Sequence, residues 1–177
     1  NRPEGRTTMH DDQTPHTDRL TGNPHLSGRT LPIGKKTQDE GEGACPAFGF
    51  LRGLHERASA VEFRFQGGNS IWFPYSWLGT WKFDPSEGLL IKFSGDLIYL
   101  VLIRGSNLDH RLASGGIDMI RAGLQRHRVL WIREMSTDDI EETGDDGPTI
   151  DSIEVAEFTS HEEVKAWLVT HAPGFTS

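Results

Sequence analysis

The sequence predicts a mainly β protein with some α-helix, an α+β fold built around a small, bent antiparallel barrel of five or six strands. Short apolar segments alternate with polar residues between positions 61 and 104, and this two-residue period is typical of half-buried strands. Glycine and proline interrupt the segments at short intervals, as turns between neighbouring strands require. These intervals leave no room for the crossover helices of a parallel sheet, which favours an antiparallel arrangement.

The first 43 residues differ in composition from the rest of the 177-residue chain. They contain four prolines, many polar residues and only isolated aliphatic side chains. Such a segment buries too little apolar surface to offset the entropy that is lost on ordering. We therefore expect a disordered tail over residues 1–43 and a barrel domain over residues 44–134.

The barrel domain is expected to begin with a short helix or a lead-in segment within residues 44–58, where glycines interrupt an apolar pattern. A strand follows at 61–65, because Val61 and Phe63 alternate with charged residues and successive side chains of a strand face opposite sides. Residues 66–69, Gln-Gly-Gly-Asn, then supply a hairpin turn.

The segment that follows predicts the rest of the barrel as a meander. Aromatic residues around Pro74 and Gly79 are expected to form two short strands on either side of a corner. Asp84 opens a turn, because its side chain can accept a hydrogen bond from the backbone ahead of it. Further strands are expected at 89–93 and at 97–104, the second of which is apolar on both faces.

A short amphipathic helix is expected next, over residues 117–126, followed by a strand over 128–134. We interpret the acidic segment 135–150 as a linker. Residues 151–172 have the pattern of a strand and a helix that pack on the barrel. Ser160 with Glu163 three residues later is a capping-box pattern, which marks the start of that last helix.

The distribution of charge along the chain is the strongest indication of function. Residues 104–133 contain six arginines and two aspartates, whereas residues 134–163 contain twelve acidic residues and no lysine or arginine. This asymmetry favours a basic face that binds an acidic partner, or an acidic segment that lies across the basic face of its own chain. The alternative is that these charges only solvate the surface. The candidate binding residues are Arg104, Arg111, Arg121, Arg126, His127, Arg128 and Arg133.

Two stretches resemble the sequence signatures of the Sm/LSm family of RNA-binding proteins. Residues 97–108, LIYLVLIRGSNL, resemble the second signature, an apolar strand followed by Ile-Arg-Gly. Residues 83–91, FDPSEGLLI, resemble the first signature. The resemblance implies a five-stranded, strongly bent barrel that assembles into rings of six or seven subunits. It also implies that Arg104 contacts an RNA base, with Gly105 and Asp84 at the matching positions.

The chain departs from the family pattern in the loop that would face Arg104. The base-recognising asparagine would fall on Gly88 and the stacking residue on Ser86, while Glu87 adds a negative charge. The family's N-terminal helix would correspond to residues 46–56, and the C-terminal half of the chain has no counterpart. The resemblance therefore supports a small barrel more than it supports RNA recognition.

Other classes of function lack the residues that they need. A net charge of −8 is unfavourable for general binding of polyanions. The only cysteine, Cys45, can form no internal disulfide, and the scattered histidines predict no metal site. Neither a Walker A loop nor a dinucleotide-binding glycine motif is present, so no cofactor is expected. A catalytic set of Cys45 with a histidine is the remaining enzyme hypothesis.

These observations predict a non-catalytic interaction module that uses the arginine-rich segment 104–133 to contact a protein partner or a second copy of itself. The alternative is an Sm-like RNA-binding protein in which the acidic segment competes with RNA for the basic face. No stretch is long and apolar enough to suggest a membrane partner. The single cysteine favours a reducing compartment, and a cytoplasmic location is expected.

Overall fold

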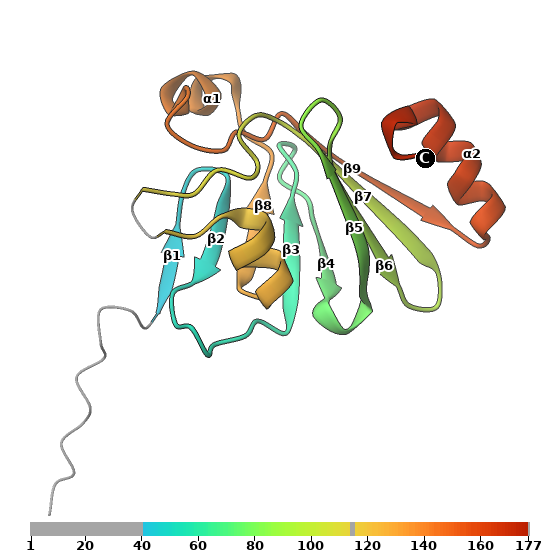
Figure 1. Ribbon diagram of the computed structural model, residues 1–177, viewed down its shortest axis with the longest axis horizontal. Coiled ribbons are helices and arrows are strands. Elements are labelled where there is room, and N and C mark those ends of the chain that lie inside the picture. The colour runs from blue at the N-terminus through green and yellow to red at the C-terminus, as the bar shows by residue number, and fades with distance from the viewer. Residues whose placement is uncertain (1–40, 114–115, 177) are drawn as a thin grey trace, which may run out of the picture. The chain divides into compact units, whose positions relative to one another are not determined.

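The computed structural model describes residues 41–113 and 116–176 of the chain. The described residues belong to one compact unit and contain nine strands, which form two sheets (Figure 1). The predicted disordered tail over residues 1–43 lies outside the described residues except at its end. There a short strand begins at Glu42.

The first sheet has five strands in the order β1-β2-β8-β3-β4. Neighbouring strands are antiparallel except β3 and β8, which run parallel. The parallel pair arises because β8, from a later part of the chain, inserts between the two earlier strands β2 and β3. The strands are β1 (Glu42–Ala44), β2 (Phe48–Leu51), β3 (Ala60–Arg64), β4 (Ser70–Pro74) and β8 (Val129–Arg133).

The second sheet has four strands in the order β5-β6-β7-β9, and all its neighbours are antiparallel. Two tight turns join its first three strands, as the sequence predicts. In the first of these turns, Asp84 Oδ1 accepts hydrogen bonds from the backbone nitrogen and the hydroxyl of Ser86. The strands are β5 (Leu78–Asp84), β6 (Gly88–Ser94), β7 (Ile98–Arg104) and β9 (Ser152–Phe158).

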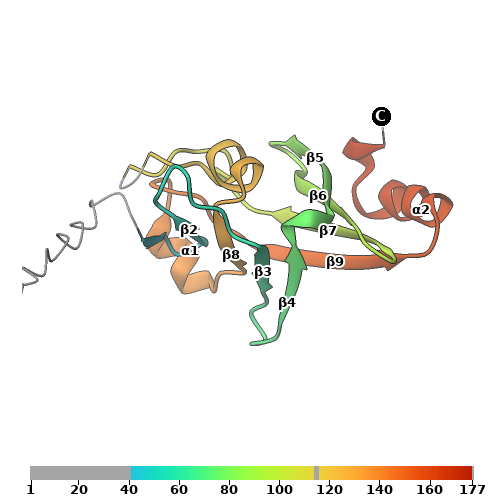
Figure 2. The same cartoon turned by 90° about the horizontal axis from the view of Figure 1, so that it is seen from below.

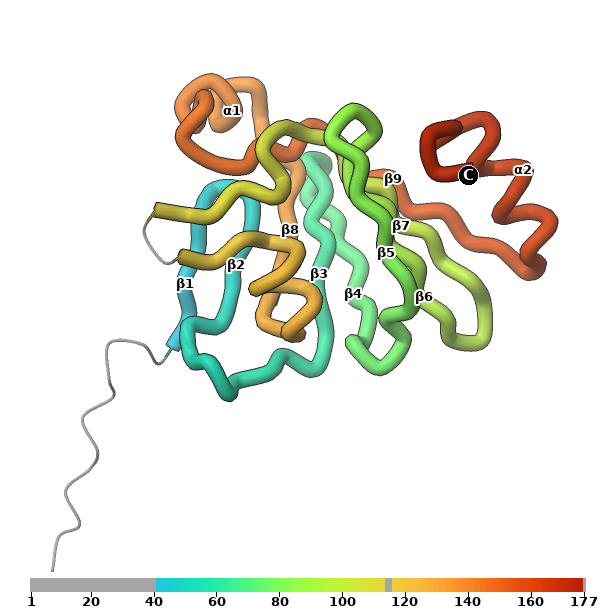
Figure 3. The backbone as a smooth tube through the Cα atoms, in the orientation of Figure 1, coloured from blue at the N-terminus to red at the C-terminus, as the bar shows by residue number. Residues whose placement is uncertain are grey.

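The prediction of an antiparallel barrel is wrong, because neither sheet closes on itself. The chain leaves the first sheet after β4, passes through a 3₁₀ turn at Tyr75–Trp77 and enters β5 of the second sheet (Figure 3). Tyr75 fixes this corner: its backbone nitrogen donates to Ser59 O and its hydroxyl donates to Val129 O, both at 2.8 Å. The coarser prediction of a mainly β fold with helices is confirmed.

Apolar side chains of the two sheets share one core. Val61 and Phe63 of β3 are fully buried, as their alternation with charged residues predicts. Phe93 of β6 stacks on Phe73 of β4 with ring centroids 4.5 Å apart, and it meets the ring of Phe63 edge-on at 6.0 Å. Aromatic contacts therefore join the first sheet to the second.

Strand β7 is buried on both faces, as its continuous apolar sequence predicts. Val101 and Ile103 belong to the core between the sheets, whereas Leu100 and Leu102 belong to a second core. Helix α2 (His161–His171) covers that second core. Figure 2 shows α2 on the side of the second sheet that lies away from β3 and β4.

Two segments before β8 differ from the expected elements. The segment expected to be a short helix or a lead-in contains strand β2, in which Phe48 and Phe50 are both buried beside β8. The expected inserted helix is irregular. It consists of a turn of π-helix at Met119–Gly123 and a 3₁₀ turn at Leu124–Arg126.

The C-terminal part of the chain is more closely joined to the sheets than a linker and an appendage would be. The segment 135–150, interpreted as a linker, contains helix α1 (Thr137–Thr143). Strand β9 pairs with β7 along all seven of its residues, so it is an edge strand of the second sheet rather than an addition to a barrel. The capping box predicted at Ser160 and Glu163 is present.

Candidate functional site at an arginine-lined pocket

The two helical turns that follow Asp118 are buried against the core on one side and exposed to solvent on the other. The carboxylate of Asp118 accepts hydrogen bonds from the backbone nitrogens of Arg121 and Ala122, which caps the turns. Their apolar residues are buried in the core between the sheets, whereas Arg121, Gln125 and Arg126 are exposed. The buried residues are Met119, Ile120 and Leu124.

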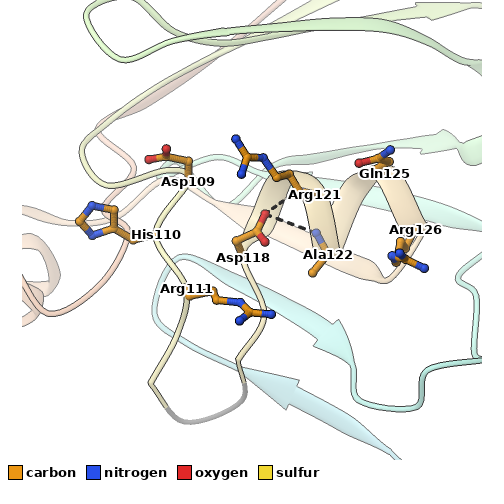
Figure 4. A pocket seen from close by; sticks show the side chains of 8 residues that line it. All are labelled: Asp109, His110, Arg111, Asp118, Arg121, Ala122, Gln125 and Arg126. Atoms are coloured by element: carbon orange, nitrogen blue, oxygen red, sulfur yellow. Dashed lines mark hydrogen bonds between the residues drawn. The ribbon is translucent and has the colours of Figure 1, made fainter.

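An open pocket of about 760 Å³ lies where these turns meet the loop that precedes them. Figure 4 shows Arg121, Gln125 and Arg126 along the turns and Arg111 on the neighbouring loop. We call this the arginine pocket, after its three arginines. The lining residues are Asp109, His110, Arg111, Asp118, Arg121, Ala122, Gln125 and Arg126.

The side chains of the three arginines are exposed, and among the described residues none of them has a hydrogen bond or an ion pair. Arginine stays charged at any physiological pH and presents five N–H donors in a planar fork. The arginine pocket is therefore chemically suited to bind an anion. A second pocket of about 340 Å³ shares Gln125 and Arg126 and adds Arg57 and His127, which extends the basic surface.

Arg104 lies outside this surface, at the end of β7 in the second sheet. Its guanidinium group is 3.6 Å from Glu154 Oε2 and donates to the backbone oxygen of His171 at 2.6 Å. The side chain of His171 also approaches Glu154, at 3.7 Å. Arg104 thus connects the end of helix α2 to strand β9. Its guanidinium group is engaged within the fold and is not free to make the contact with an RNA base that the Sm-like resemblance implies.

Arg128 and Arg133 hold parts of the first sheet together. Arg128 is buried and donates to the backbone oxygens of Leu51 and Arg52 at 2.9 and 2.7 Å. Burial, with the nearby positive charges of Arg57 and Arg126, lowers the pKa of Arg128. Arg133 donates to the backbone oxygen of Pro46 at 3.1 Å and pairs with a carboxylate of α1.

His127 has a structural role and also borders the basic surface. It adopts the left-handed conformation with φ of 54°, which ends the helical turns. Its ring stacks on Tyr75 with centroids 4.5 Å apart. Burial raises the pKa of Tyr75, so the phenol stays protonated and can donate its hydrogen bond to Val129 O.

The acidic segment does not cover the arginine pocket. Of the carboxylates in the acidic stretch 134–163, Asp139 pairs with Arg133 at 3.3 Å and Glu154 pairs with Arg104. The two arginines that this segment neutralises are therefore not those of the pocket. Five acidic residues in and after α1 have exposed side chains, and these side chains make no hydrogen bond or ion pair within the described part of the chain. These are Asp138, Glu141, Glu142, Asp145 and Asp146.

Three of the seven predicted residues therefore line one pocket, and sequence reasoning missed some of their neighbours. Arg57 was missed because it lies in the segment taken as a lead-in, far from the arginine-rich run. Gln125 follows Arg121 by four residues, and this spacing could have placed both on one helical face. In the sequence, Asp118 was considered only as a negative charge within the arginine-rich segment. An aspartate that precedes a helical pattern is also a signal for an N-terminal cap.

The environment of Cys45 gives little support to the enzyme hypothesis. Burial raises the pKa of the Cys45 thiol, which disfavours the nucleophilic thiolate. The neighbouring pocket of about 340 Å³ is lined by acidic and apolar residues and includes no described histidine. Within residues 41–113 and 116–176 no group of three potential metal ligands is found.

No protein-family model matches this chain, and comparisons with curated proteins and with solved structures give no match. In the described residues, no helix has both the length and the apolar character that crossing a membrane requires.

Proposed function

We propose that the protein is a non-catalytic interaction module whose arginine pocket binds an acidic segment of a protein partner. One observation supports this most directly. The side chains of Arg64, Arg104, Arg128 and Arg133 are each hydrogen-bonded within the fold, whereas the guanidinium groups of the three arginines that line the pocket have no partner among the described residues. Arginines that line one pocket without an internal partner can recognise carboxylates or phosphates through paired, charge-assisted hydrogen bonds.

A carboxylate-bearing protein segment fits the pocket better than RNA does. Asp109 and Asp118 also line the pocket, and their charges oppose the dense negative charge of a phosphate backbone. Among the described residues, the lining includes no tryptophan, tyrosine or phenylalanine on which a base could stack. In addition, Arg104, the residue that the Sm-like resemblance assigns to a base, is engaged with Glu154.

The non-catalytic part of the proposal follows from the same geometry. The pocket brings together arginines, which stabilise charge, and the described residues that line it include no cysteine, serine or lysine nucleophile. A cytoplasmic location is part of the proposal, since the half-buried Cys45 is a free thiol.

The proposal is tested with a fluorescently labelled decaglutamate peptide and a labelled single-stranded oligouridylate, whose binding is followed by fluorescence anisotropy at several salt concentrations. The double variant Arg121→Gln/Arg126→Gln should weaken peptide binding by about tenfold or more, because it removes two donors of charge-assisted hydrogen bonds. The salt dependence of peptide binding should also become less steep.

A matched control is the double variant Arg52→Gln/Lys165→Gln, which removes two exposed positive charges elsewhere on the surface. It should bind the peptide as the wild type does. Equal losses in both double variants would show that only net charge matters and would contradict the proposal. If the protein binds oligouridylate through Arg121 and Arg126 but does not bind the peptide, the ligand of the pocket is RNA and the proposal of a protein partner is wrong.

A further inference from the structure

We infer that the acidic segment that occupies the arginine pocket is helix α1 of a second copy of this chain, so that copies associate head to tail. This inference rests on the proposed function, because it names the partner of the same pocket. It follows from two surfaces of opposite charge, neither of which is neutralised by the described part of its own chain.

Helix α1 presents its unpaired carboxylates together. Asp138, Glu141 and Glu142 lie at positions i, i+3 and i+4, which fall on one face of a helix. Asp145 and Asp146 follow directly after Gly144, the C-cap of the helix. All five side chains are exposed. The acidic face therefore offers several carboxylates at once to a surface that holds three arginines.

The acidic face is also held in a defined place, which limits the entropy that binding would cost. Ser136 and Asp139 form a capping box at the start of α1. Asp139 is paired with Arg133, and Ile140 packs against the core between the sheets. The carboxylates that point outward from α1 are thus presented by an anchored helix.

Within one molecule, α1 and the helical turns that carry Arg121 and Arg126 are attached to opposite faces of the first sheet. Arg133, which pairs with α1, shares a face with Arg64, whereas the adjacent Ile132 and Phe63 are buried in the core. The helical turns of the pocket pack on that core side. Figure 2 also shows the turns and α1 on opposite sides of this sheet.

Because the two charged surfaces lie on opposite faces, a contact between copies is heterologous. Each copy would offer α1 to one neighbour and the arginine pocket to another, and such contacts produce open chains or rings. The contact is expected to be sensitive to salt, since exposed charges form it and the whole chain carries a net charge of −8.

The test uses the full chain and two charge-reversal variants. The pocket variant is Arg121→Glu/Arg126→Glu, and the helix variant is Glu141→Lys/Glu142→Lys. At low ionic strength, sedimentation should show that the average mass of the wild type rises with concentration above the 19.8 kDa of one chain. Each variant alone should remain a monomer. An equimolar mixture should associate again, because the pocket variant keeps an intact α1, the helix variant keeps an intact pocket, and the two reversed surfaces are also opposite in charge.

The control is Arg52→Glu/Lys165→Glu, which has the same net charge as the pocket variant and both surfaces intact, and it should associate as the wild type does. A monomeric wild type at every concentration would overturn the inference, and so would association that persists in both variants. If the decaglutamate peptide still binds to such a monomer through Arg121 and Arg126, the proposed function stands and only the identity of the partner is wrong.

Discussion

At the scale of single residues, the Arg104-Gly105 pair has a structural explanation. Beyond β7 the chain runs beside the segment that leads into β9: Asp151 N donates to Arg104 O at 2.8 Å, and the backbones of Ser106 and Thr149 bond in both directions. A Cβ atom on Gly105 would collide with the backbone oxygen of Thr149. The glycine is therefore required by close packing of two backbones rather than by a ligand.

Gly105→Ala is accordingly expected to destabilise the fold by about 2 kcal/mol or more, since a backbone oxygen cannot move aside as a flexible side chain can. Urea unfolding followed by tryptophan fluorescence measures this change. Gly67→Ala is the control, because a Cβ atom there meets no atom within 4 Å, and it should leave the free energy of unfolding within about 1 kcal/mol of the wild type. Equal effects of the two substitutions would refute the close-packing explanation.

At the scale of elements, the carboxylate of Glu163 holds the segment that leads into α2. The side chain of Glu163 accepts hydrogen bonds from the backbone nitrogen and hydroxyl of Thr159 and from the backbone nitrogen of Ser160. These bonds lower the pKa of Glu163. A lowered pKa means that the carboxylate stabilises the helix above its unfolded-state pKa, and that this stabilisation is lost as the pH falls through the folded value.

Glu163→Gln should therefore reduce the dependence of thermal stability on pH in the acidic range, because the variant has no charge to lose at this position. Thermal unfolding followed by circular dichroism, from about pH 6 to about pH 3, measures it. Glu162→Gln removes the same charge from an exposed neighbour that makes no hydrogen bond through its side chain among the described residues. An identical pH dependence in the two variants would show that the capping carboxylate contributes nothing specific.

The elements that could be predicted are those whose pattern is local. The hairpin strands β3 to β7, the strand β8, the pair β9 and α2, and the capping box of α2 all follow from alternation and turn residues. Strand β2 was missed because Gly49 and Gly53 interrupt its pattern. Gly49 is in fact covered by the indole of Trp131, a neighbour eighty-two positions later in the sequence that no local pattern reveals.

The same limit applies to the candidate site. The run of arginines indicated a basic region, and three of its members do meet at one pocket. The sequence did not show that Arg104, Arg128 and Arg133 are used within the fold, because their partners are backbone oxygens or carboxylates from other elements. Arg57 joins the surface only because its segment folds back beside the turns.

At the scale of the whole molecule, alternation predicts which face of a strand is buried but not which strands share a sheet. A closed barrel and two facing sheets require the same inward-facing residues. The difference lies in the corner at Tyr75–Trp77 and in the insertion of β8 between β2 and β3. Both depend on contacts between distant parts of the chain. The two sheets that result are joined by one aromatic core, which should make them unfold together.

Phe93→Ala tests this cooperativity, because the ring of Phe93 in the second sheet contacts both Phe63 and Phe73 in the first. The substitution should lower the free energy of unfolding by about 3 to 5 kcal/mol. Native-state hydrogen exchange should then show an equal loss of protection in β3 and β8 and in β6 and β7, since one opening reaction exposes all four strands. Trp72→Ala, at a side chain that is 60% exposed, should change the protection of these strands little. A loss confined to β6 and β7 would mean that the two sheets open independently and that the shared core does not couple them.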